Sequence, residues 1–262
     1  MRGYLLAFAI LWTWIVGCKG GEEVVPPEVK NEPPTIEFVM APAEGDLLST
    51  SRVELAWIGH DKEGAPLEYS YRVDSSEWSP WTKDTSLVLE DVTEGKHSFE
   101  VKARDDRQES QVIGRSFAVD AVKGPAVMLS PYYVLISKDQ DLKLDLLLDD
   151  AKDVLGGRFV IRYDRTKLEP TEVVEGDLFK KNGAMVAFLK VLKRDEGFLE
   201  LDISALGGNP PTITGSGVVA KLVFKAIGSS MEGKISIEVD LRDGQNNPIK
   251  ATGIPWHLRA KG

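Results

Sequence analysis

The residue types that most often do chemistry in proteins are sparse in this chain and are not grouped. Its three histidines, His60, His97 and His257, have no histidine or cysteine close to them in the sequence, which is not the spacing of a metal site. The chain has neither a Gly-x-Ser-x-Gly nucleophile elbow nor a glycine-rich phosphate loop. Carboxylates are plentiful, but a glycosidase also needs a cleft around two of them. We therefore expect no catalytic residues, no metal site, no cofactor and no enzymatic activity.

Two tryptophans and two acidic loops remain as candidate ligand sites in the first half of the chain. Trp78 and Trp81 stand close together in "EWSPW", where they form either an aromatic platform for a sugar ring or a cap on a sheet edge. The loops "GHDKEG" and "ARDDRQE" are either calcium sites or solvated turns, and neither has the dense ligand spacing of an EF-hand. A carbohydrate-binding receptor or adhesin, with a polysaccharide as ligand, is therefore the alternative function for this chain.

The chain's single cysteine, Cys18, follows an apolar run over residues 3–17. This run is too short for a spanning helix with normal flanks, but it has the length of a secretory signal core. With the letters "IVGC" at residues 15–18, the segment resembles the lipobox of bacterial lipoproteins. The resemblance implies that residues 1–17 are a signal peptide and that Cys18 becomes the lipidated first residue of the mature chain. An ordinary signal peptide with an incidental cysteine and a retained single-span anchor are the alternatives.

Residues 18–34, "CKGGEEVVPPEVKNEPP", are rich in proline, glycine and glutamate and cannot bury a core. We expect a disordered spacer that holds the following domains away from a membrane. The lipid anchor implies a location in the cell envelope, outside the cytoplasm, at the outer membrane or the cell surface. The formal net charge is −9 and neither half of the chain has a basic excess, which excludes nucleic acid as a partner.

The remaining sequence alternates apolar and polar residues with the period of two that marks strands covering a core on one side. The segments "RVELAWI", "LEYSYRVD" and "HSFEVKARD" follow this pattern, and turn signals such as "KEGAP" and "DGQNN" separate the strands. No helix of ten or more residues is predicted. A break at "DAVKGP", residues 120–125, divides the chain into two all-β domains, residues 35–120 and 125–262.

The first domain combines "YSYRVD", "EWSPW" and "EGKHSFEVKARD" in an order that resembles bacterial immunoglobulin-like or fibronectin type III-like domains. The resemblance implies an immunoglobulin-like sandwich. Because this family is a structural one, it implies a spacer or an interaction module more than a specific activity.

The second domain contains "RYD" followed by "LE", then "GSGVVAKLVFKA", then "KISIEVDLRDGQNNPI". In this order, across residues 125–253, the segments resemble the cohesin domain. The resemblance implies a nine-stranded jelly-roll sandwich related to carbohydrate-binding modules. It also implies that the chain docks a dockerin-like protein, and that calcium is required through the partner.

The resemblance further implies where the partner binds, because cohesins bind dockerin on one sheet face formed by the third, fifth, sixth and eighth strands. By position these strands are residues 156–163, 184–192, 198–205 and 217–226. The register of the fifth is ambiguous, because "AMVAFLKVL" is apolar on both faces. The implied partner-binding residues are Arg158, Val160, Arg162, Glu200, Asp202, Val219, Lys221 and Val223.

The three valines of this set, Val160, Val219 and Val223, would form a small apolar patch with a charged rim, as in a specific interface. Alternatively, they serve strand propensity alone. Arg158 stands where well-known type I cohesins tend to carry an acidic or amide residue, which implies a dockerin of divergent type. The sequence thus predicts a non-catalytic, lipid-anchored cell-surface protein that docks a dockerin-bearing or similar secreted protein.

Overall fold

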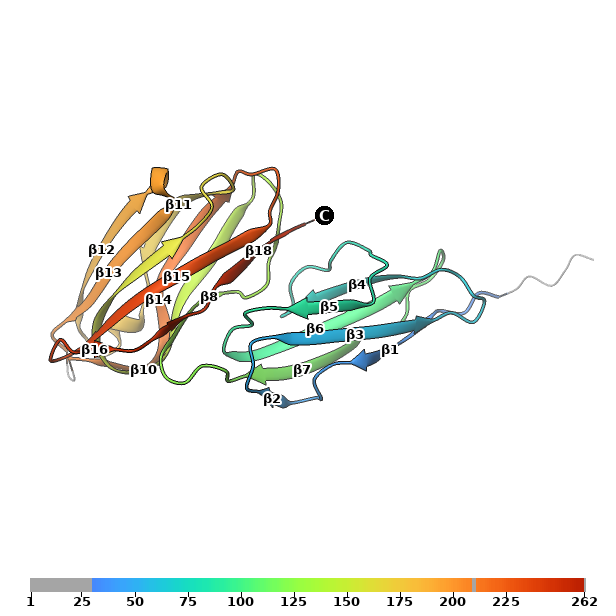
Figure 1. Cartoon of the computed structure of the whole chain (residues 1–262), viewed down its shortest axis with the longest axis horizontal. Helices are drawn as coiled ribbons and strands as arrows, with labels where there is room; N and C mark the ends of the chain where they lie inside the picture. Colours follow the sequence, from blue (N-terminus) through green and yellow to red (C-terminus); the bar gives the residue numbers. More distant parts are fainter. Residues whose placement is uncertain (1–29, 209–210, 262) are drawn as a thin grey trace, which may run out of the picture. The chain divides into compact units, whose positions relative to one another are not determined.

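The structure is a computed structural model that describes residues 30–208 and 211–261 (Figure 1). The predicted all-β class is confirmed, since the helices of these residues are two single 3-10 turns, η1 (Leu178–Lys180) and η2 (Arg194–Glu196). Neither turn has the length needed to cross a bilayer. The predicted signal peptide, Cys18 and most of the predicted spacer lie outside the described residues.

The first sandwich consists of two small sheets. Its strands are β1 (Thr35–Met40), β2 (Asp46–Leu48), β3 (Val53–His60), β4 (Glu68–Val73), β5 (Ser86–Leu89), β6 (Gly95–Arg104) and β7 (Ile113–Val119). One sheet has the order β1-β3-β5 and the other the order β2-β7-β6-β4. The inward side chains predicted from the alternation in β3 and β6 are buried, among them Trp57 and Phe99.

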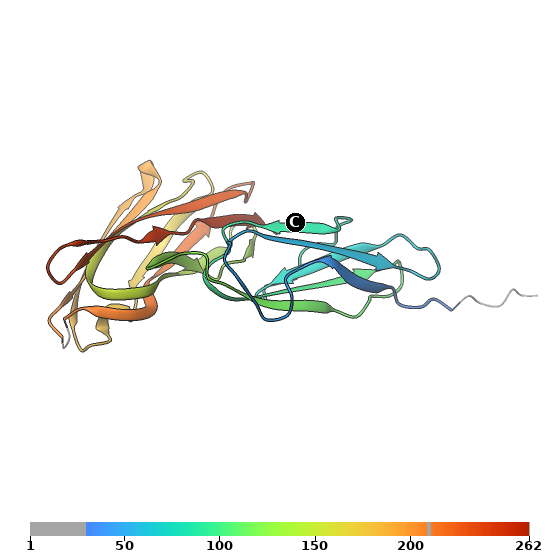
Figure 2. The same ribbon diagram turned by 60° about the horizontal axis from the view of Figure 1, so that its bottom comes forward.

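The second sandwich follows after residue 125. Its strands are β8 (Ala126–Ser130), β9 (Leu135–Ile136), β10 (Asp141–Arg162), β11 (Leu168–Glu175), β12 (Met185–Lys193), β13 (Phe198–Leu206), β14 (Ile213–Ala226), β15 (Gly233–Asp243), β16 (Pro248–Ile249), β17 (Thr252–Gly253) and β18 (Trp256–Ala260). They lie in two layers (Figure 2). One layer has the order β11-β14-β10-β8, and the other has the order β12-β13-β10-β15.

Strand β10 belongs to both layers. Its first half pairs with β14 and β8, and its second half pairs with β13 and β15. Between the halves the register with β14 shifts, and Asp150 and Asp153 have positive φ angles of 47° and 52°. Such bulges bend a strand and change its direction, which lets one strand pass from the first layer into the second.

Two large hydrophobic clusters match the two sandwiches. The cluster of the second sandwich includes Phe159, Leu201, Phe224 and Trp256, all fully buried. The cluster of the first sandwich also takes in Tyr132 and Tyr133, which follow β8. The residues from 32 onward form one compact unit by their contacts, and the predicted boundary at residues 120–125 falls between β7 and β8.

Candidate functional site

The outer surface of the second layer carries the largest group of the predicted partner-binding residues. We call the outward side chains of β12, β13, the second half of β10, and β15 the β12–β15 face. The register places its side chains in four rows that run across the strands. In the order β12-β13-β10-β15, the rows are Ala187-Ser204-Gly156-Arg242, Leu189-Asp202-Arg158-Asp240, Val191-Glu200-Val160-Glu238 and Lys193-Phe198-Arg162-Ser236.

The centre of this face is polar, and each arginine on it reaches a carboxylate in a neighbouring row. Arg158 donates to Glu200 at 2.5 Å, Arg162 to Glu238 at 2.6 Å, and Arg242 to Asp240 at 2.8 Å. The hydrogen bond from Arg162 lowers the pKa of the Glu238 carboxyl below its usual value. These pairs are solvent-exposed, so each contributes little to folding stability. They do neutralise most of the charge on the face.

Val160 lies between these ion pairs. Its neighbours along the strand, Phe159 and Ile161, point into the core, so Val160 points outward as predicted. It is nevertheless only 9% exposed, and it lines a shallow hollow of about 400 Å³ together with Arg158, Arg162 and Glu238. Val160 is therefore the floor of a depression and does not project from the surface.

The apolar part of the face lies on β12, the edge strand whose register the sequence left ambiguous. Pairing with β13 puts Met185, Leu189 and Val191 on the outer surface, where they are 74%, 67% and 45% exposed. We call these three residues the apolar row. The sequence does not single out these three residues, because both faces of "AMVAFLKVL" are apolar, and only the pairing with β13 shows which side is exposed.

The outer edge of β12, which pairs with no other strand among the described residues, carries a charged side chain that disfavours pairing with a strand of another molecule. Lys190 lies on the inner side of β12, and its Nζ donates to the carbonyl of Val173 on β11 at 2.8 Å. A charged side chain pointing inward at a sheet edge discourages edge-to-edge association. The apolar row is thus available to a partner through its outer face more than through its backbone edge.

Three of the eight predicted residues do not lie on this face. Val219, Lys221 and Val223 are on β14, which pairs with the first half of β10 in the other layer. The position beside the second half of β10 is taken by β15, so the assignment of residues 217–226 to that position was wrong. The functional candidates missed in this way are Glu238, Asp240 and Arg242.

Val219 also departs from the predicted outward orientation. The register of β14 against β10 shifts between the Leu146–Ala220 pair and the Leu147–Val218 pair, which leaves Val219 as the extra residue of a bulge. A bulge interrupts the alternation of side chains, and Val219 turns into the core with no exposed surface. Lys221 is exposed and Val223 half-buried, both on the layer opposite the β12–β15 face.

The two candidate sugar-stacking tryptophans are covered by cations. Arg72 and Lys102 lie over the Trp78 ring at 4.7 and 4.9 Å, and Lys102 and Arg104 lie over the Trp81 ring at 5.1 and 4.2 Å. Both rings are half-buried. Because a sugar would need an open ring face, this arrangement favours the interpretation of a cap on the sheet over that of a carbohydrate platform.

The acidic loops of the first sandwich use carboxylates to hold their own turns. Asp61 Oδ1 accepts a hydrogen bond from the Ala65 amide at 2.6 Å, and Asp105 Oδ1 accepts from the amides of Arg107 and Gln108. Side chains of this type stabilise turns by bonding the backbone a few residues on. This geometry favours the interpretation of solvated turns.

Residues 138–253 match the family model of the cohesin domain. The matched segment contains all four strands of the β12–β15 face. Cohesin domains are non-catalytic modules of protein–protein interaction, so the prediction that the chain is not an enzyme is confirmed for this segment. The comparison with curated proteins gave no match.

Several solved structures are similar to this chain at low identity. A non-cellulosomal cohesin from the archaeon Archaeoglobus fulgidus is 14% identical with a TM-score of 0.42, covering 53% of this chain and 93% of that one. A type II cohesin domain from the cellulosome of Acetivibrio cellulolyticus is 15% identical with a TM-score of 0.44, covering 52% and 94%. A type I cohesin–dockerin complex from Clostridium thermocellum is 13% identical with a TM-score of 0.43, and the match covers 53% of this chain and 99% of that one.

Proposed function

We propose that this chain is a lipid-anchored, non-catalytic protein of the cell envelope whose β12–β15 face docks a dockerin-bearing or similar secreted protein. The observation that carries the proposal is the coincidence of two features. The cohesin match covers all four strands of this face, and the same face exposes the apolar row on β12. Exposed apolar side chains bordered by polar ones are typical of protein-binding surfaces.

The charges of the face suit a specific contact. Its arginines are already paired with carboxylates of the same face, so a partner does not have to neutralise an excess of one sign. The apolar row supplies the burial that drives association, and the paired charges restrict which partners fit.

The predicted lipid on Cys18 completes the proposed function. A domain held at the outer membrane or the cell surface by residues 18–34 would retain a secreted partner close to the cell. Uptake of labelled palmitate by the full chain expressed in a bacterium tests this part. Cys18→Ala should remove the label, and an unlabelled wild-type chain would contradict the anchor.

Docking is tested by titrating the full chain with a panel of purified type I and type II dockerin modules. Leu189→Asp should weaken any observed binding at least tenfold, because full burial of a leucine contributes roughly 1.5–3 kcal/mol and an aspartate in its place resists desolvation. Val174→Asp is the matched control, since Val174 is also exposed, at 45%, but lies on β11 in the other layer. Equal losses in the two variants would contradict docking on the β12–β15 face.

Calcium should act through the partner in this proposal. Chelation should abolish docking while it leaves the unfolding transition of the chain itself unchanged. Docking that survives chelation would exclude a partner built on calcium-binding loops.

A further inference from the structure

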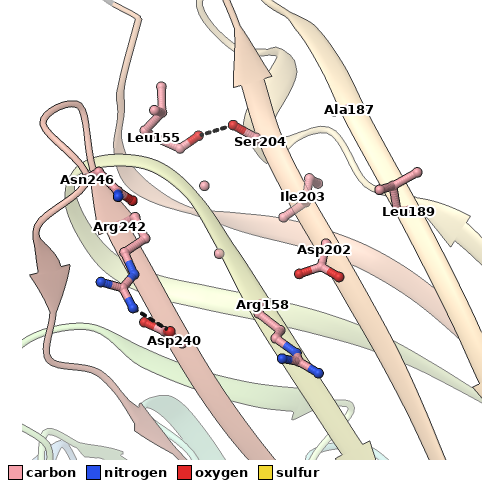
Figure 3. Close-up of a pocket in the computed structure, with 12 residues that line it drawn as sticks. Leu155, Arg158, Ala187, Leu189, Asp202, Ile203, Ser204, Asp240, Arg242 and Asn246 are labelled. Atoms are coloured by element: carbon pink, nitrogen blue, oxygen red, sulfur yellow. Dashed lines mark hydrogen bonds and ion pairs between the residues drawn. The ribbon is translucent and has the colours of Figure 1, made fainter.

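The β12–β15 face contains a hollow of about 440 Å³ at one end, next to the apolar row. Leu155, Ala187, Leu189 and Ile203 give it apolar surface, and Asp202, with the charged residues of β10 and β15, lies at its rim (Figure 3). Its volume falls within the rough range of 300–1,000 Å³ found for ligand pockets. It is the deeper continuation of the face that the proposed function assigns to docking.

The hollow is open because Gly156 carries no side chain in the outer row that it shares with Ala187, Ser204 and Arg242. A Cβ atom on Gly156 would lie 2.5 Å from the carbonyl oxygen of Ile203. The next residue, Gly157, faces the core, where a Cβ would lie 2.5 Å from Cδ2 of the buried Leu241. Both distances are far below van der Waals contact, so the strand cannot carry side chains here without moving. The local sequence "LGGR" therefore fixes a depression where the neighbouring rows carry side chains.

Asp202 is the acidic side chain of the face that remains unpaired. Within residues 30–208 and 211–261, it forms no hydrogen bond and no ion pair, whereas Glu200, Glu238 and Asp240 each bond an arginine. It is half-buried and lies between Leu189 and Arg158 in its row. Arg158 is directed to Glu200, which leaves Asp202 as an open acceptor at the rim of the hollow (Figure 3).

The spacing of the hollow and of Asp202 fits one turn of a helix. The row that contains Gly156 and the row that contains Asp202 are two residues apart along the strands, which is roughly 6.6 Å. Side chains three or four residues apart on a helix are separated by roughly 5–6 Å. A helix lying on the face can therefore place one side chain in the hollow and the next one over Asp202.

We propose that the hollow receives a leucine or methionine side chain from a helix of the docked partner, and that Asp202 receives a lysine or arginine one turn away. This inference rests on the proposed docking function. It adds the pair of partner residues that would decide which secreted protein is retained. A partner carrying a carboxylate at the second position would meet Asp202 with like charge and would be rejected.

The test is a selection of displayed dockerin modules, with the exposed helix positions randomised, against the full chain. The expected winners carry leucine or methionine followed three or four residues later by lysine or arginine. Asp202→Lys should reduce binding of such a winner at least tenfold, and a second selection on this variant should return aspartate or glutamate at the basic position. Ala187→Trp should fill the hollow and reduce binding to a similar extent.

Lys221→Glu, an exposed charge change on the other layer, is the control and should leave binding unchanged. Unfolding curves of all variants should coincide, because the altered side chains lie at the surface. Selection of no binder at all would overturn both the docking function and this inference. Binders that lack the pair, or that are indifferent to Ala187→Trp and Asp202→Lys, would overturn this inference and leave the docking function standing.

Discussion

The bulge in β14 makes Val219 and Val223 very different sites, although both were expected on one outer surface. Val219 is fully buried in the core of the second sandwich, and its carbonyl accepts a hydrogen bond from the Gly176 amide at 2.9 Å. Val223 is half-buried at the surface of the same strand. Val→Thr substitutions probe this difference, because threonine keeps the shape and the strand propensity of valine while adding a hydroxyl.

At position 219 the hydroxyl would enter an apolar cluster, and a buried polar group without a partner costs about 1–3 kcal/mol. With a urea dependence of about 2 kcal/mol per molar, the middle of the usual range, the unfolding midpoint should fall by about 0.5–1.5 M. At position 223 the hydroxyl remains hydrated, so the midpoint should hardly move. The two variants thus make the same Val→Thr change on the same strand, and what is compared is the burial of the two positions.

The assay is hydrogen exchange of the β10 and β14 amides as a function of urea, which reports the second sandwich separately from the first. Val219→Thr should lower the protection of both strands, while Val223→Thr should match the wild type. Equal urea midpoints for the two variants, or a lower midpoint for Val223→Thr, would refute the inward orientation of Val219. The side chains of β14 would then alternate regularly between the core and the surface.

Three further predictions concern other parts of the molecule. Burial lowers the pKa of the His97 imidazole, but its 2.8 Å contact with Asp74 outweighs burial and raises that pKa above its usual value. The stabilisation of the folded state by the protonated His97 imidazole should therefore be complete below a pH of about 6.5, the value for an unfolded chain. It should be lost as the pH rises through the raised pKa of the folded state. Urea midpoints of the first sandwich should follow that trend, and Asp74→Asn should flatten it. For the exposed Arg162–Glu238 pair, a double-mutant cycle on unfolding should give little or no coupling energy, and a substantial coupling would mean that the pair is shielded from water. For Gly176→Ala, the new Cβ would lie 2.2 Å from the Val218 carbonyl oxygen, so a loss of about 1–3 kcal/mol is expected in urea unfolding; an unchanged midpoint would contradict this close approach.

The strands themselves could be predicted from the sequence because alternation is a local signal. The buried positions of β3 and β6, and the turn in which Asp164 accepts a hydrogen bond from the Thr166 amide, follow from neighbouring residues alone. Sheet order is not local. The segments "GSGVVAKLVFKA" and "KISIEVDLRD" are equally good strands, and only the complete fold decides which one lies beside the second half of β10.

The candidate site was predictable in part for the same reason. Arg158, Arg162, Glu200 and Asp202 lie on one face because they alternate with core residues on strands that do pair. The apolar row escaped prediction because β12 is an edge strand whose inner face is only partly covered, so both of its faces remain apolar. Val219 escaped because a bulge changes the period at one residue and leaves no mark in composition.

The continuity of β10 has a mechanical consequence for the second sandwich. One unbroken strand is bonded to β14 and β8 in one layer and to β13 and β15 in the other. A pull applied at Arg158 or Arg162 therefore acts along a strand that is paired on both sides over residues 156–162 in one layer and over residues 145–148 in the other. The layers cannot slide past each other without breaking hydrogen bonds of this strand, so a force on the β12–β15 face is distributed through both layers and does not act on a single edge strand.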